Sequence, residues 1–82
     1  MSALSDALMH GITAQVQANS PQAQQEKQVV TDYLNSSKMD RVSKAKAGIL
    51  EIEEALSKDG LSPATKTNLE KLSALMFELA AS

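Results

Sequence analysis

The sequence predicts an all-α protein built around an antiparallel helical hairpin, with its two helices at about residues 38–58 and 63–80. Two observations lead to this prediction. In both segments apolar residues recur at steps of three and four, the spacing of a helix that packs one face against another helix. A short connector containing Gly60 separates them, and a link this short leaves two helices as antiparallel neighbours. One or two shorter helices should precede the hairpin, giving a small helical bundle or an oligomeric helical assembly.

The apolar seam of the hairpin can be read directly from these steps. In the first helix the seam consists of Val42, Ala45, Ile49, Ile52 and Leu56. In the second helix it consists of Leu69, Leu72, Met76 and Leu79. An average step of about 3.5 residues keeps such a stripe narrow and facing its partner. We therefore expect these residues to form the contact between the two helices.

The connector carries stop and start signals in the right order. Gly60 can take the left-handed conformation that ends a helix without steric penalty, and if it is the first residue past the cap, Leu61 would touch Leu56 in a Schellman ending. Ser62 offers its hydroxyl as an N-cap, and Pro63 suits the first helical position, where its missing N–H costs nothing. The sequence therefore predicts a reversal of the chain at this point.

The start of the hairpin and its surface charges are also predicted. Ser37 followed three residues later by Asp40 matches the spacing of a capping box, with Asp in place of the usual Glu or Gln. Two pairs spaced by four residues, Asp40 with Lys44 and Glu54 with Lys58, are expected to form surface ion pairs. Lys38, Arg41, Lys44 and Lys46 form a basic cluster, which is interpreted as a solvated face, although it could meet an acidic partner or phosphates.

Residues 1–36 are predicted to form a separate N-terminal segment, helical and partly mobile, which acts as a docking arm beside the hairpin at 37–82. A helix is expected from Ala3 to Ala18, and a second after Ser20 as N-cap, with Pro21 at its first position. The six glutamines between residues 15 and 28 either lie on a solvated helix or stay mobile until a partner binds. The apolar residues assigned to the arm are Leu4, Leu8, Ile12, Val16, Val30, Tyr33 and Leu34.

Length and composition limit the kind of protein this is. A chain of 82 residues forms one domain at most and buries only about 60% of its unfolded surface, so its core is marginal. The absence of cysteine excludes disulfides and thiolate chemistry, and a net charge of −2 gives no global field toward nucleic acid. There is neither a cleavable signal nor a membrane span in the sequence, so a cytoplasmic location is expected, with signal-less export left open.

The sequence offers little material for catalysis. His10 is the only histidine, without a second ligand for a metal or an evident nucleophile beside it. Glu51, Glu53 and Glu54 are more consistent with a solvated helix face than with a cation site, because a divalent ion takes ligands from several places. Glycine-rich phosphate loops and nucleophile motifs are absent from the sequence. We therefore expect neither an enzyme nor a metal, cofactor or small-molecule substrate.

The apolar residues outside the seam predict how the protein is used. Leu50, Leu75 and Phe77 widen the apolar surface beyond what one hairpin covers. Either the N-terminal helices close a monomeric bundle over them, or a second chain covers them. We expect a non-enzymatic interaction or assembly protein that forms a homo-oligomer or binds a protein partner. The residues expected to pack against the chain itself or a partner are Ile49, Ile52, Leu56, Leu69, Leu72, Leu75, Met76, Phe77 and Leu79.

Two resemblances suggest more specific roles. In size and hairpin form the chain looks like the small helical subunits and co-chaperones of bacterial type III secretion systems, and like small phage accessory proteins, an analogy of architecture. The run from Gly60 to Thr65 resembles the turn of helix-turn-helix DNA-binding proteins. It departs from that pattern at Lys66, where an apolar residue normally locks the two helices, and Lys71 is the only further base of that helix. A small DNA-binding regulator using residues 60–72 is thus the alternative function, with nucleic-acid binding disfavoured.

Overall fold

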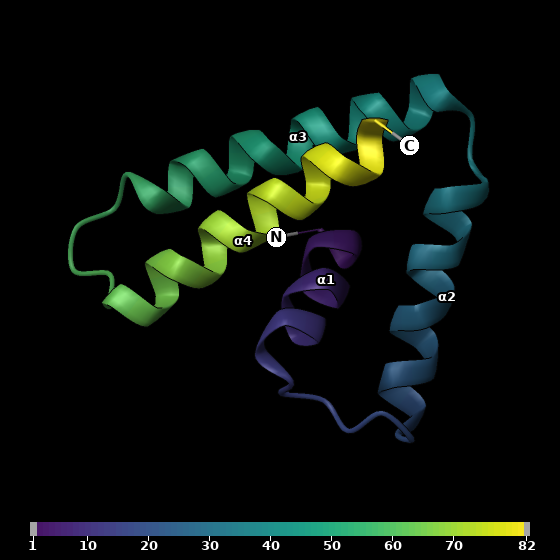
Figure 1. The fold of residues 1–82 in the computed structure, drawn as a ribbon, viewed down its shortest axis with the longest axis horizontal. Helices are drawn as coiled ribbons and strands as arrows, with labels where there is room; N and C mark the ends of the chain where they lie inside the picture. The colour runs from purple at the N-terminus through teal and green to yellow at the C-terminus, as the bar shows by residue number, and fades with distance from the viewer. Residues whose placement is uncertain (1, 82) are drawn as a thin grey trace.

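A computed structural model describes residues 2–81 of the chain, and Figure 1 shows its fold. These residues form four helices: α1 (Ala3–Thr13), α2 (Pro21–Asn35), α3 (Lys38–Leu56) and α4 (Pro63–Ala81). The part of the chain that is described contains helices and connecting turns and no strand. The all-α prediction is confirmed.

The helices α3 and α4 form the predicted antiparallel hairpin and lie side by side along its length (Figure 1). Ile52, Leu72 and Met76 are buried in the seam, with Ala45 and Leu69. Gly48 of α3 sets the closeness of the two helices, because a Cβ atom built at this glycine would lie 2.6 Å from the Met76 sulfur. Gly48 and Met76 therefore occupy the same level of the hairpin.

A serine caps the N-terminus of each described helix. The hydroxyl oxygens of Ser2, Ser20, Ser37 and Ser62 each accept a hydrogen bond from the backbone N–H three residues later, at 3.1 to 3.2 Å. The caps expected at Ser20, Ser37 and Ser62 are confirmed, and Pro21 and Pro63 begin their helices as predicted. Each cap satisfies a backbone donor that the first helical turn leaves without a partner.

The connector differs in detail from the Schellman ending. Gly60 has a positive φ of 83°, as expected, but α3 already ends at Leu56. The backbone N–H of Ser57 donates to the carbonyls of Glu53 and Glu54, and that of Lys58 donates to Ala55. The last turn thus tightens before the glycine is reached, a common way to satisfy the final carbonyls. Gly60 turns the chain within the connector and does not cap the helix itself.

The helix predicted over Ala3–Ala18 is too long. Helix α1 ends at Thr13, and Ala14 takes a left-handed conformation with φ 53°. The Thr13 hydroxyl donates to the Met9 carbonyl at 3.0 Å, so a β-branched side chain occupies the last turn where the helix stops. Val16 consequently lies in the loop that leads to α2, outside any helix.

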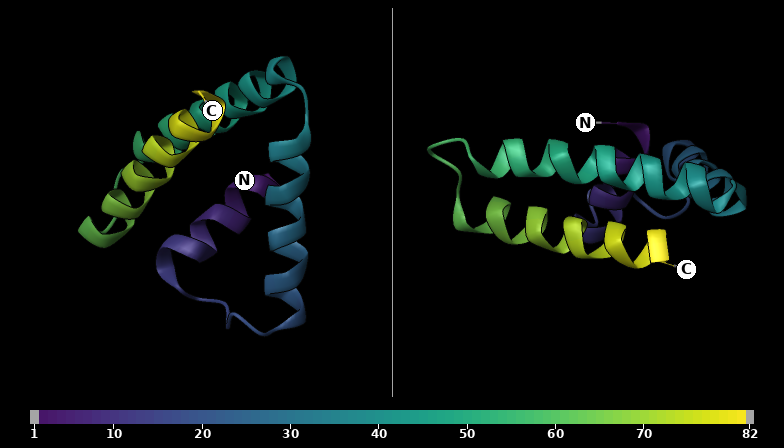
Figure 2. Two further views of the ribbon diagram at one scale, coloured as in Figure 1. Left: turned by 45° about the vertical axis from the view of Figure 1, so that its right-hand side comes forward. Right: turned by 90° about the horizontal axis from the view of Figure 1, so that it is seen from above.

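The N-terminal helices lie on one side of the hairpin. Helix α1 contacts α2 and α4, and it lies in the space bounded by the hairpin and α2 (Figures 1 and 2). Seen from above in the right panel of Figure 2, α3 and α4 are both unobstructed along their length. The core draws on all four helices and consists of Leu4, Leu8, Tyr33, Ile52, Leu69, Leu72 and Met76.

Candidate functional site

The side of the hairpin that faces away from α1 and α2 carries exposed apolar side chains. Leu50 is 62% exposed and Phe77 is 60% exposed. Leu50 follows Gly48 by two residues, which places it roughly 200° around α3. Because Gly48 faces Met76 and the Ser5 hydroxyl of α1, Leu50 points away from the rest of the molecule.

Phe77 lies on the same side of the hairpin. On α4, Leu75 and Leu79 flank Met76 on the side opposite to Phe77, and both are half-buried against the core that includes residues of α1. Phe77 points to the opposite side and is 60% exposed, so neither α1 nor α2 covers it. Since Gly48 and Met76 are level, Leu50 and Phe77 lie within about one helical turn of each other along the hairpin.

Met39 and two charged residues complete this surface. Met39 is 81% exposed and precedes Leu50 by eleven residues, so it falls within about 20° of it on α3. Lys46 and Glu53 are exposed one turn before and one turn after Leu50. We call Met39, Lys46, Leu50, Glu53 and Phe77 the outer face. It combines three large apolar side chains with one charge of each sign.

The predicted surface ion pairs are not formed. Within residues 2–81, His10 contacts Glu26, whereas the side chains of Asp40 and Lys44, and those of Glu54 and Lys58, do not approach to within 4 Å of each other. Pairs of this kind stabilise a helix by only a few tenths of a kcal/mol, which is too little to hold two solvated side chains in one geometry. The charges of Lys46 and Glu53 are likewise not satisfied by a neighbour on the described part of the chain.

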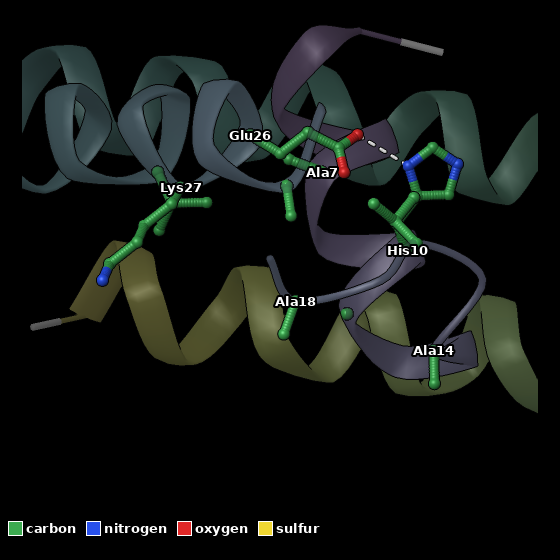
Figure 3. Close-up of a pocket in the computed structure, with 10 residues that line it drawn as sticks. Ala7, His10, Ala14, Ala18, Glu26 and Lys27 are labelled. Atoms are coloured by element: carbon green, nitrogen blue, oxygen red, sulfur yellow. Dashed lines mark hydrogen bonds and ion pairs between the residues drawn. The ribbon is translucent and has the colours of Figure 1, made fainter. Parts of the chain in front are cut away.

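A first cleft, of about 360 Å³, lies between α1, the loop after it and α2. Ala7, Ala14, Ala18 and other small or apolar residues line it, and Figure 3 shows His10 and Glu26 facing each other at its edge. The His10 Nδ1 and Glu26 Oε2 atoms are 2.6 Å apart. This contact links α1 to α2.

The second cleft, of about 380 Å³, lies where α1, α2 and α3 meet, and Tyr33 lines its wall. Tyr33 is buried, and its hydroxyl donates to the backbone carbonyl of Arg41 at 2.9 Å. The Arg41 guanidinium donates to the carbonyl of Ser36 at 2.5 Å, across the turn between α2 and α3. Burial raises the pKa of the Tyr33 phenol above its ordinary value, and the positive charge of Arg41 lowers it in part. These bonds fix the corner between the two helices.

The structure divides the predicted packing residues into three groups. Leu72, Met76 and Ile52 are fully or almost fully buried with Leu69 in the chain's own core, and Ile49, Leu56, Leu75 and Leu79 are half-buried around it. Phe77 alone of this set is exposed. The residues assigned to the docking arm are also distributed: Leu4, Leu8 and Tyr33 are buried, Ile12, Val16 and Val30 are half-buried, and Leu34 is 44% exposed.

Among residues 2–81, no group of three or more His, Asp or Glu residues is placed to hold a metal ion. None of the described helices is both long and apolar enough to cross a membrane. Helix-turn-helix motifs cross their helices at about 90–120°, whereas α3 and α4 run antiparallel (Figure 1), so the resemblance at residues 60–65 does not extend to this geometry.

The sequence alone predicts only part of the outer face. Apolar spacing separates Leu50 and Phe77 from the seam, but it does not by itself link Met39, Lys46 and Glu53 to them. The signal was present, because Lys46 and Glu53 stand four residues before and three residues after Leu50 and so share its side of a helix.

Comparison with known proteins gives no relative, since neither a family model nor a curated protein nor a solved structure matches this chain.

Proposed function

We propose that the protein is a non-catalytic helical interaction protein whose outer face binds another protein chain. The observation that supports this most is the exposure of both Leu50 and Phe77, each about three-fifths exposed, on the uncovered side of a hairpin whose seam is already filled. Large apolar side chains exposed on one face of a small domain are typical of interaction sites. The role would be that of a small adaptor, a co-chaperone or a structural subunit, as in a bacterial secretion system or a phage.

The mechanism would be the packing of helix against helix. Leu50 and Phe77 are already about two-fifths covered, so covering the rest of each side chain stabilises a complex by about 1–2 kcal/mol, three-fifths of the value for full burial. Association costs on the order of 4 kcal/mol or more in lost rotational and translational freedom. The two anchors therefore at most offset this cost, and the remaining affinity must come from Met39 and from the charges at Lys46 and Glu53. A reversible contact follows from these magnitudes.

The remaining features are consistent with this role. The chain has no cysteine, which suits a reducing compartment, and a cytoplasmic location is part of this proposal. His10 and Glu26 contact each other across the first cleft and Tyr33 fixes the corner of the second. Both groups thus have a structural task, and the outer face is the surface left for a partner.

Site-specific photo-crosslinking in cells that make the protein tests this proposal. A photoreactive amino acid at Leu50 or Phe77 should give a crosslinked protein product, whereas the same group at Gln25, which is exposed on α2, should not. The Gln25 variant is a matched control because it shares the probe, the expression level and the helical setting. Crosslinks no stronger at Leu50 and Phe77 than at Gln25 would show that the outer face binds no protein.

A further inference from the structure

The charges of α3 run against its helix dipole. Its first half holds Lys38, Arg41, Lys44 and Lys46 with one acidic residue, Asp40, while its second half holds Glu51, Glu53 and Glu54. A helix is stabilised by acidic residues near its N-terminus and basic residues near its C-terminus, so most of this pattern is unfavourable for α3 alone. The arrangement is complementary to a second helix of the same sequence running in the opposite direction.

On the outer face, two residues carry this charge complementarity: Lys46 and Glu53. Lys46 lies about 40° to one side of Leu50 around α3, and Glu53 lies about 60° to the same side. The two are seven residues, or roughly 10.5 Å, apart along the helix, and their midpoint falls half a residue from Leu50. A two-fold axis through that midpoint would place Lys46 of each copy level with Glu53 of the other copy. The dimer would then contain two equivalent Lys46–Glu53 pairs.

We propose that the partner of the outer face is a second copy of this chain. The two α3 helices pack antiparallel about a two-fold axis beside Leu50. The two Leu50 side chains meet at the axis, and Lys46 of each copy pairs with Glu53 of the other. This inference rests on the proposed function and specifies the partner.

The mixture of charges favours this occupant over others. A uniformly acidic partner helix would leave Glu53 facing like charge, and a uniformly basic one would do the same to Lys46. A second copy in the antiparallel orientation satisfies both residues at once, as isologous dimers do by symmetry. Phe77, level with Gly48 on the neighbouring helix α4, lies on the side of Leu50 that faces the seam, where it extends the apolar contact.

Charge reversal provides a test with an internal rescue. In sedimentation velocity of the purified chain, K46E and E53K should each weaken dimerisation by at least roughly tenfold, because each places two like-charged pairs across the axis. An equal mixture of K46E and E53K should dimerise again, since both cross-axis pairs are then of opposite sign. The double variant K46E/E53K should also dimerise. The exposed residue Lys27 gives the matched control, K27E, which should behave as the parent chain.

Cysteine crosslinking tests the axis independently, and the chain has no cysteine of its own to interfere. Helices packed at 8–10 Å bring facing Cα atoms to about 3.5–5.5 Å, which overlaps the range of a disulfide. Under a copper-phenanthroline oxidant, L50C should form a disulfide-linked dimer in dilute solution, whereas the exposed-site variant Q25C should not. Circular dichroism should show unchanged helix content in all these variants.

The outcomes separate this inference from the proposed function. A chain that stays monomeric at high concentration, or that dimerises without the charge rescue and without the L50C crosslink, overturns the antiparallel dimer. If photo-crosslinking at Leu50 then captures a different protein, the outer face is still an interaction site and only its partner has been misassigned. If nothing is captured there, both proposals fail.

Discussion

Replacing Leu72 with alanine should destabilise the fold severely. Leu72 is fully buried at the centre of α4, in the core shared by the hairpin and α1. Its truncation removes buried methyl groups and leaves a cavity, and substitutions of this kind cost about 2–5 kcal/mol. Because the Leu72 side chain is completely enclosed, we expect a loss of about 3 kcal/mol, near the middle of that range.

This loss is large relative to the total stability. At about 0.05–0.15 kcal/mol per residue, a domain of this length is stable by roughly 4–12 kcal/mol. For a domain of this size, each kcal/mol shifts the Tm by about 4–8 °C, so Leu72→Ala should lower the Tm by about 12–24 °C. Urea unfolding followed by circular dichroism would give the free energy directly.

Leu50→Ala is the matched control for this substitution. It removes the same atoms from a helix of the same hairpin, but Leu50 is 62% exposed, so its free energy of unfolding should change by no more than about 0.5 kcal/mol. Both variants should be compared at a concentration where they are monomeric, because dimerisation would add to the apparent stability. Equal losses at the two positions, or a larger one at Leu50, would refute the assignment of core and outer face.

Three further predictions concern single positions. Gly11→Ala should raise the free energy of unfolding by about 0.5–1 kcal/mol, because a Cβ atom there meets nothing within 4 Å. Gly48→Ala should raise it less, or lower it, because its Cβ atom meets the Met76 side chain. The same response at both sites would contradict the close approach of Gly48 to Met76. The folded state raises the pKa of Tyr33, so it holds the phenol proton more tightly than the unfolded state, and this stability is present below about pH 10 and lost above it. In urea titrations, the free energy of unfolding of Tyr33→Phe should fall less between neutral and alkaline pH than that of the parent chain. An equal fall in both proteins would contradict this role of Tyr33. Ser37→Ala removes the cap of α3 and should cost about 1 kcal/mol in the same titration, with no measurable cost arguing that the cap is replaced by water.

The hairpin could be predicted because local and long-range signals agree along it. Apolar spacing, Ser62 with Pro63, and Gly60 all favour two helices that reverse at one place, and the structure has them there. The N-terminal helix was predicted less well. Val16 continues the four-residue spacing of Leu4 and Leu8, but the chain leaves the helix at Ala14 and turns back so that α2 can pack against α1. The spacing of apolar residues alone does not reveal where α1 ends, because packing between helices sets that end.

The candidate site was predictable only in part, for a related reason. Periodicity separated Leu50 and Phe77 from the seam, since both fall off the narrow stripe. It could not decide which side α1 covers, because that depends on contacts between distant segments, such as the hydrogen bond of 3.3 Å from the Ser2 N–H to Glu51. The role of Gly48 was also hidden. A glycine inside a helix lowers helix propensity, and only the neighbouring Met76 explains why it is suited to that position.

The burial of Tyr33 gives the protein a built-in optical reporter. It is the only tyrosine and the chain has no tryptophan, so its emission reports on the bend between α2 and α3 alone. Far-ultraviolet circular dichroism, in contrast, sums over all the helices. Following both signals through one denaturation experiment would therefore reveal whether the bend opens together with the hairpin or before it, without any label being attached.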